Sequence, residues 1–319
     1  MYLTPEKELY TIIQQYYSGK YSDITSLDLD AEFDFSNVLY DIEAHFYKIR
    51  SYLILEDYSN AAELLNIIEK KIISNNENNL IDSKTSNLLI NDVKILNSFI
   101  DFKKLNLIDH ELLNSIDNNT PSLALIYKKI IESNSKISIS SPDLDLESFI
   151  YLLFLNSNIE NKEIDLKIIK NLKSHYSDSL ILDFAIAWLG LSKSTIINDD
   201  DSIANIKNSY YFFDELSSSS NTDSIKNTIN LLACQLKLGN IPEALECIEK
   251  LKSFNEKDTL KSWNYSLLIN KIALESIKLN SVDRLSLIEK IKKDFPESSY
   301  VKDLNEKDDL FTSIVSTYN

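Results

Sequence analysis

Residues Ser224 to Leu251, SIKNTINLLACQLKLGNIPEALECIEKL, decide the fold of this chain. Apolar residues recur three or four positions apart on both sides of Leu238-Gly239-Asn240, so each side predicts a helix with one apolar face. Glycine adopts the left-handed conformation that ends a helix without a Cβ penalty, and Pro242 has no N–H to lose at the start of the next helix. The small Ala244 lets the two backbones approach closely. The stretch therefore predicts a helical hairpin.

The same turn pattern occurs twice more. Gly19 is followed two residues on by Tyr21, and Glu56 stands where a glycine would precede Tyr58 and Ala61. Two of the three glycines in the chain fall at such turns. The pattern is typical of tetratricopeptide repeats, in which a hairpin buries its apolar face only against its neighbours. We therefore predict an all-α, tetratricopeptide-like solenoid of helical hairpins.

Composition supports an all-α protein and excludes several functions. Hydrophobic residues make up 44% of the 319 residues, whereas 3 glycines and 5 prolines leave little material for turns between strands. The formal net charge is −16, from 33 basic and 49 acidic residues. Such a chain gains nothing from counterion release at phosphates, so we expect no binding to nucleic acid and no direct docking on an anionic membrane. A basic or neutral protein is the expected partner.

We expect residues 1–319 to form a single solenoid. The clearest break, SNSKISISSPD at 133–143, suggests sub-halves at 1–135 and 143–319. Residues 296–319 are expected to form a C-terminal helix that, with Trp263, caps the open end of the solenoid. The polar stretches 28–34, 75–79, 199–201 and 217–220 are predicted to be loops. Because the N-terminus resembles no signal peptide and the longest apolar run is too short to cross a bilayer, we expect a soluble cytoplasmic protein.

No catalytic or cofactor-binding pattern is present. His45, His110 and His175 lie 65 residues apart with no second ligand at metal-binding spacing, so no metal site is expected. Three scattered glycines cannot form a phosphate-binding loop. Cys234 and Cys247 have apolar neighbours and are predicted to be reduced core residues. The sequence therefore favours a protein that is not an enzyme and needs no cofactor.

Adjacent aromatic residues are the best candidates for partner binding. Neighbours in a helix point about 100° apart, so one ring of each pair enters the core and the other faces a different surface. Packing between repeats and contact with a partner both remain open for each ring, and we also expect Trp188 in the central core. Tyrosine, tryptophan and arginine are common in binding hot spots. The candidate partner-binding residues are Tyr17, Tyr47, Arg50, Trp188, Tyr210, Tyr211 and Phe213.

Several stretches together resemble the epsilon subunit of coatomer in order and spacing. They are QYYSGKY at 15–21, FYKIRSYL at 46–53, AIAWL at 185–189, SYYFFDEL at 209–216, the hairpin at 224–251, and the tail at 295–302 and 309–318. The resemblance implies a non-enzymatic subunit of the COPI vesicle coat, with a solenoid that is curved or curled into a ring. It further implies that the chain holds and stabilises the C-terminal domain of the coatomer alpha subunit. By the same resemblance, the chain is expected to act in Golgi-to-ER and intra-Golgi transport. It would lie at the periphery of Golgi membranes and COPI vesicles, and its contact with the membrane would be indirect.

The alternative is a tetratricopeptide-type peptide-binding adaptor or cochaperone. A clamp for acidic C-termini needs several Lys, Arg and Asn side chains on the first helices of successive repeats. Only Arg50 stands out among the expected inner-face residues, and the net charge of −16 repels acidic peptides. This class is therefore the second choice.

Overall fold

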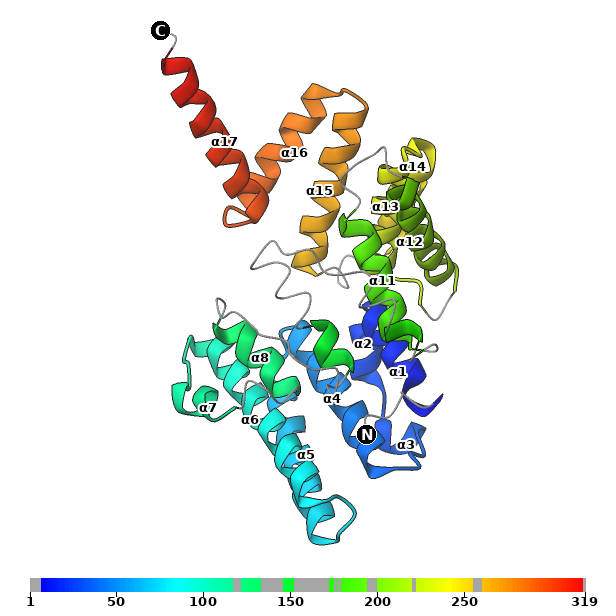
Figure 1. Ribbon diagram of the computed structural model, residues 1–319, viewed down its shortest axis with the longest axis vertical. Coiled ribbons are helices and arrows are strands. Elements are labelled where there is room, and N and C mark those ends of the chain that lie inside the picture. The colour runs from blue at the N-terminus through cyan, green and yellow to red at the C-terminus, as the bar shows by residue number, and fades with distance from the viewer. Residues whose placement is uncertain are drawn as a thin grey trace. The chain divides into compact units, whose positions relative to one another are not determined.

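The computed structural model describes residues 7–116, 122–132, 146–151, 172–174, 176, 179–193, 200–219, 222–254 and 260–317. Within these ranges the regular secondary structure is helical throughout (Figure 1), which confirms the all-α prediction. The chain divides into two compact units, with residues 1–196 and 219–222 in unit 1 and residues 197–218 and 223–319 in unit 2. The expected break at 133–143 lies outside the described residues.

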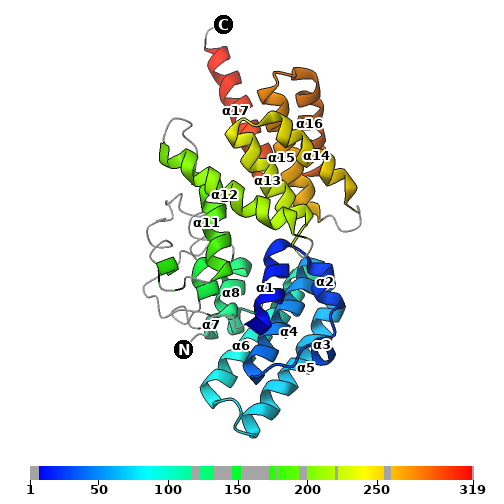
Figure 2. The same cartoon turned by 90° about the vertical axis from the view of Figure 1, so that its right-hand side faces the viewer.

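Unit 1 is built from helices that pack against their neighbours along the chain. They are α1 (Lys7–Ser18), α2 (Tyr21–Ser26), α3 (Leu29–Glu32), α4 (Val38–Ile54), α5 (Tyr58–Glu77), α6 (Ser83–Leu105), α7 (His110–Ser115), α8 (Leu123–Glu132) and α11 (Leu180–Lys193). Helix α4 packs against α1, α2 and α5, and α6 packs against α5 and α8 (Figure 2). Buried aliphatic residues spaced three or four apart, among them Ile42, Ile49 and Leu65, form the core between α4, α5, α6 and α8.

Unit 2 follows the same plan. Its helices are α12 (Asp200–Ser218), α13 (Ile225–Leu238), α14 (Ile241–Ser253), α15 (Lys261–Ile277), α16 (Ser281–Asp294) and α17 (Ser299–Ser316). Helix α13 contacts α12, α14 and α15, and α15 contacts α16. Cys234 and Cys247 are buried and free, as predicted, and burial raises the pKa of their thiols to about 12 and about 11. Sequential packing of this kind is consistent with helical repeats.

Five of the hairpin turns share one backbone geometry. A residue just after the first helix is left-handed, with φ of 84° at Gly19, 60° at Glu56, 58° at Asn79, 75° at Gly239 and 57° at Leu279. In each turn the next N–H donates to the carbonyl oxygen five residues earlier at 2.9 Å, as in a Schellman motif. The predicted turns at Gly19, Glu56 and Gly239 are confirmed. Leu279 reaches the same geometry without the glycine-and-aromatic turn pattern, although leucine rarely adopts this conformation.

The hairpin at 224–251 has the predicted local structure. Ser224 caps α13 by accepting a hydrogen bond from the Asn227 N–H at 3.1 Å. Pro242 lies in the first turn of α14, and the Ala244 side chain is fully buried. The expected close approach of the two helices therefore holds at this turn.

Several predicted loops are partly helical. Residues 29–32 form α3, capped by Asp28, and Leu29 is buried. Helix α5 extends to Glu77, and α12 includes Asp200, Asp201, Ser217 and Ser218. Acidic residues in the first turn of α3 interact favourably with the helix dipole, so the polar composition of this stretch did not prevent helix formation.

Among the described residues, no helix is both long enough and apolar enough to cross a bilayer.

Candidate protein-binding sites

A buried ion pair lies at the centre of unit 1. Helix α4 carries Tyr47 and Arg50 one turn apart, and both side chains are buried. Glu147, in the helical residues 146–151, accepts a hydrogen bond from Arg50 Nη2 at 2.8 Å. The Tyr47 hydroxyl donates to Oε2 of the same carboxylate at 3.1 Å, and the Tyr17 hydroxyl donates to Oε1. Three donors from α1 and α4 therefore converge on one carboxylate.

The surroundings of this pair favour the charged form of both groups. Burial alone would raise the pKa of Glu147, but the charge of Arg50 and the hydrogen bonds from Arg50, Tyr17 and Tyr47 bring it below its ordinary value. Burial would lower the pKa of Arg50, but Glu147 holds it well above its ordinary value. Burial and the nearby carboxylate raise the pKa of Tyr17 well above that of an exposed tyrosine, so its hydroxyl stays a donor.

Aromatic rings surround the ion pair. Arg50 Cζ lies 4.6 Å from the ring centre of Tyr16, 5.1 Å from that of Tyr47 and 5.8 Å from that of Tyr151, at cation–π distances. The Tyr17 ring lies 6.4 Å from the half-buried Trp188 on α11. We call this group the Arg50 centre.

The Arg50 centre brings together four of the seven candidate residues: Tyr17, Tyr47, Arg50 and Trp188. Contact between these four and a partner stays a prediction, because here the polar groups of Tyr17, Tyr47 and Arg50 are engaged by Glu147 of the same chain. Glu147 itself was missed. It lies 97 residues from Arg50 in a segment with no recognisable motif, so no sequence spacing connects the two.

The other three candidates lie on α12 in unit 2, and they differ in exposure. Phe213 is fully buried and Tyr210 is half-buried, whereas 65% of Tyr211 is exposed. The ring centres of Tyr210 and Tyr211 are 5.2 Å apart. As expected for adjacent helical residues, one aromatic side chain packs inside while another reaches solvent. Of the seven candidates, Tyr211 is the one that offers a broad exposed ring.

The C-terminal half of α17 exposes an apolar face. Leu310, Phe311, Ile314 and Val315 are 60%, 68%, 48% and 40% exposed, and their spacing places them on one side of the helix. We call these four residues the α17 stripe. The N-terminal turn of α17 packs differently, because Val301 and Tyr300 join the apolar cluster of α15 and α16. The apolar residues of this helix were expected to cover the end of the helical array. Those beyond its first turns are instead exposed to solvent.

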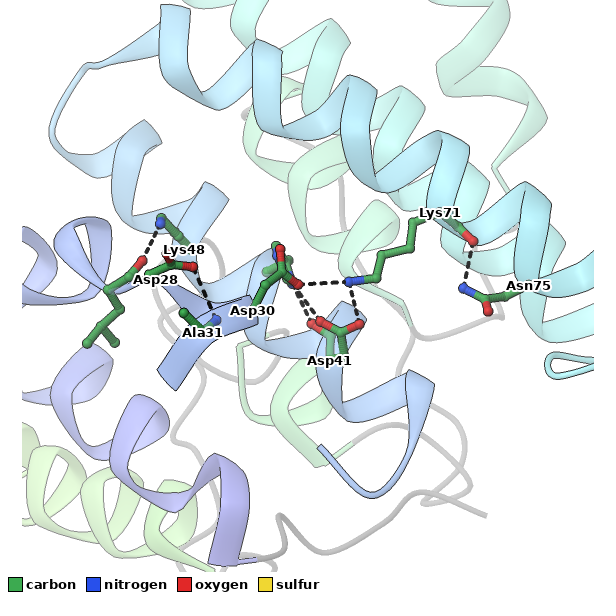
Figure 3. A network of polar contacts seen from close by, with 9 residues as sticks. Asp28, Asp30, Ala31, Asp41, Lys48, Lys71 and Asn75 are labelled. Atoms are coloured by element: carbon green, nitrogen blue, oxygen red, sulfur yellow. Dashed lines mark hydrogen bonds and ion pairs between the residues drawn. The ribbon is translucent and has the colours of Figure 1, made fainter. Parts of the chain in front are cut away.

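A second polar network links α3, α4 and α5 (Figure 3). Lys71 Nζ lies 2.5 Å from Asp41 Oδ2 and 3.4 Å from Asp30 Oδ1. His45 Nδ1 lies 2.8 Å from the carbonyl oxygen of Asp41 and 3.0 Å from Asp41 Oδ1. The network fixes the short helix α3 to the two long helices.

Asp30, Asp41 and His45 also place one potential metal ligand atom each within 4.8 Å of one another. The Lys71 ammonium already lies against both carboxylates, and the His45 Nδ1 that faces a carbonyl oxygen acts as a donor. In that tautomer Nδ1 has no lone pair to offer a metal ion. The arrangement therefore fits an ion-pair clamp better than a metal site.

Comparison of the chain with protein-family models finds no match, and neither does comparison with curated proteins. The functional interpretation therefore depends on the residues and contacts described above and on the sequence resemblance.

Proposed function

We propose that this chain is a non-enzymatic structural subunit of a COPI-type vesicle coat, similar to the epsilon subunit of coatomer. In this proposal its helical hairpins form a curved, tetratricopeptide-like solenoid that binds and stabilises the C-terminal domain of the alpha subunit. It acts in the cytoplasm, peripheral on Golgi membranes, and reaches the membrane only through its partner. The coatomer assignment depends on the ordered sequence resemblance.

The observation that carries the protein-binding part of this proposal is the α17 stripe. Four large apolar side chains on one helix face, each at least 40% exposed, are unfavourable in water, and a contiguous exposed apolar face is typical of a protein–protein interface. The same helix carries four acidic residues, Asp303, Glu306, Asp308 and Asp309, against the two lysines Lys302 and Lys307, and Lys307 pairs with Asp303 at 2.6 Å. Its remaining charge is acidic, so a partner with an apolar centre and a basic rim would fit it. The net charge of −16 supports the same kind of partner.

Calorimetric titration of the full chain with the C-terminal domain of the coatomer alpha subunit tests this proposal. We expect a stable complex with an interface of the size usual for specific protein–protein complexes, roughly 1,200–2,000 Å² of total buried surface. Leu310→Ser with Phe311→Ser should weaken the affinity at least about tenfold, since hot-spot side chains typically contribute more than 1 kcal/mol each. Ile67→Ser with Ile73→Ser is the matched control, because both isoleucines are exposed on α5.

The titration tests the coatomer assignment and the role of the α17 stripe separately. No heat of binding for the wild-type chain at micromolar concentrations would contradict the coatomer assignment. Equal affinities of the wild type and the α17 variant would remove the α17 stripe from the interface.

The alternative, a peptide-binding adaptor, is favoured by one observation. A cavity lies beside the Arg50 centre and is lined by residues of α1, α4, α5, α6 and α8 and by Tyr151. Binding of short peptides in the absence of any coatomer subunit would support this function.

A further inference from the structure

A cavity of about 470 Å³ in unit 2 is lined by residues of α15 and α16 and by Phe295, which follows α16. The two helices pack side by side (Figure 1). Leu267, Leu268 and Phe295 give the cavity an apolar wall, and Asn264 adds one amide group. Ligand sites typically combine such apolar walls with a small number of polar groups that fix the orientation of the ligand.

The charged side chains of this cavity are mainly lysines. Lys261, Lys271 and Lys290 line it, and within the described residues none of the three belongs to an ion pair. The Lys261 ammonium lies 5.8 Å from the ring centre of Phe295, at a cation–π distance. Asp294 is the one carboxylate among the described residues that line the cavity. Three lysines against one aspartate leave an excess of two positive charges, and we call this site the lysine cavity.

The charges around the lysine cavity do not cancel this excess. Lys252 adds a positive charge near Lys271, but it pairs with Glu249 at 2.6 Å, so these two neighbours add no net charge. Lys271 is half-buried, and its pKa is lowered first by burial and then by the charges of Lys290 and Lys252, although Glu249 opposes the shift. An anion in the cavity would relieve the repulsion among these ammonium groups.

The charge of that anion follows from the excess. A carboxylate carries a single negative charge, whereas a phosphate monoester carries about −1.5 to −2 at neutral pH and has three strong acceptor oxygens. The phosphate therefore matches two positive charges. Its oxygens can also accept hydrogen bonds from several ammonium groups at once, because each lysine offers three donors.

The source of the phosphate follows from the rest of the chain. The net charge of −16 repels an extended polyanion, such as a nucleic acid or an anionic membrane. A single phosphate is compensated inside the cavity, and charges more than about 8 Å away are largely screened at physiological salt. The apolar wall beside the lysines can take an uncharged side chain. These features favour a phosphorylated side chain within an otherwise uncharged protein segment.

We propose that the lysine cavity binds a phosphorylated serine or threonine of a partner protein, with the phosphate against the three lysines and a neighbouring apolar side chain against Leu267 and Phe295. This inference rests on the protein-binding part of the proposed function and names a kind of segment that unit 2 takes. Phosphorylation of the partner would then strengthen the contact.

The test uses the full, isotope-labelled chain and NMR titration with acetyl-phosphoseryl-leucinamide. The same dipeptide with serine or aspartate in place of phosphoserine, and inorganic phosphate, are the comparison ligands. We expect saturable shifts with the phosphoserine probe and a Kd on the order of a millimolar, as is usual for a ligand of this size. The aspartate probe should bind at least about tenfold more weakly, because it has one charge and fewer acceptors. Inorganic phosphate should bind more weakly as well, since it lacks the leucine side chain.

Three variants locate the site. Lys271→Gln with Lys290→Gln should weaken binding of the phosphoserine probe at least about tenfold. Lys292→Gln with Lys293→Gln is the matched control, because it removes the same charge from exposed lysines of α16 that do not line the cavity, and it should change the affinity less than about twofold. Asp294→Asn removes the opposing carboxylate and should strengthen binding at least about twofold.

Several outcomes would each overturn the inference. They are the absence of saturable shifts with the phosphoserine probe, equal affinities for the phosphoserine and aspartate probes, and equal losses in the two double lysine variants. Inorganic phosphate that binds as tightly as the phosphoserine probe would show that the cavity takes a free anion. Sedimentation with vesicles of phosphatidylcholine and a phosphatidylinositol phosphate, if the Lys271 and Lys290 variant abolished it, would assign the cavity to a lipid headgroup.

The experiment also separates this inference from the proposed function, because no coatomer subunit is present. None of its results would affect a measured complex with the alpha subunit, and the absence of that complex would leave binding of the phosphoserine probe unchanged. If the variant of Lys271 and Lys290 fails to fold, the gain expected in Asp294→Asn and the comparison of the probes in the wild type still decide the question.

Discussion

The two units use polar and apolar side chains in opposite ways. Unit 1 buries a charged arginine, a carboxylate and several tyrosine hydroxyls at its centre, whereas unit 2 exposes four large apolar side chains along α17. A buried charge is tolerated because its partners are provided by the same chain. The free-energy cost of exposing an apolar face to water is removed when another molecule covers that face. The comparison teaches that the charged centre of unit 1 is satisfied by contacts within the chain, and we infer that the α17 stripe of unit 2 is covered by a partner.

The largest effect is expected from breaking the ion pair. Arg50→Met leaves Glu147 charged and buried without its counterion, which should lower the free energy of unfolding by about 3–5 kcal/mol. Combining it with Glu147→Leu should restore most of that stability, because an apolar pair in place of a buried ion pair is often neutral or stabilising. Chemical denaturation of both variants measures the two values. A double variant as unstable as the single one would show that the ion pair itself is not the cause.

Two nearby aromatic side chains on α12 test which face of this helix is buried. Phe213→Ala should lower the free energy of unfolding by about 3–5 kcal/mol, because this side chain is fully buried. Tyr211→Ala, two residues away and 65% exposed, should change it by no more than about 0.5 kcal/mol. Thermal unfolding followed by circular dichroism distinguishes them. Similar losses for the two variants would contradict the orientation of α12.

The polar network around Asp41 should make a smaller, pH-dependent contribution. Burial alone would raise the pKa of Asp41, but the hydrogen bonds from His45 and Lys71 and the charge of Lys71 lower it below its ordinary value. A carboxyl group with a lowered pKa stabilises the folded state above its unfolded pKa of about 3.9, and this contribution is lost as the pH falls through the folded value.

Asp41→Asn should therefore lower the free energy of unfolding at pH 7 by roughly 1–3 kcal/mol, as expected for hydrogen bonds to a charged group. The difference from the wild type should shrink as the pH drops below about 4. Urea denaturation at a series of pH values measures it. A difference that does not depend on pH would show that the loss is steric and not electrostatic.

The smallest effects are expected at the hairpin turns, which have the same backbone geometry in both units. Glu56 holds a left-handed φ of 60° that favours glycine, so Glu56→Gly should raise the free energy of unfolding by about 1 kcal/mol. Gly239→Ala should lower it by about 1–2 kcal/mol through φ alone, because an added Cβ would meet no atom within 4 Å. Denaturant midpoints check both signs. A gain at Gly239 would contradict its left-handed conformation.

The sequence predicted those features that depend on local spacing. The turns at Gly19 and Glu56 and the hairpin around Gly239 are determined by residues a few positions apart, and the structure confirms them. The pairing of Arg50 with Glu147 depends on contacts across 97 residues, which no periodicity shows. Likewise, apolar spacing predicts the exposed face of α17 but does not indicate whether another helix covers it.

The central claim is that a partner protein covers the α17 stripe. Hydrogen–deuterium exchange of the full chain, measured alone and with the C-terminal domain of the coatomer alpha subunit, tests it most directly. We expect backbone amides in residues 304–316 to exchange more slowly in the mixture, while those of the buried helix α4 change little. Unchanged exchange across 304–316, under conditions where the two proteins elute as one complex, would contradict it.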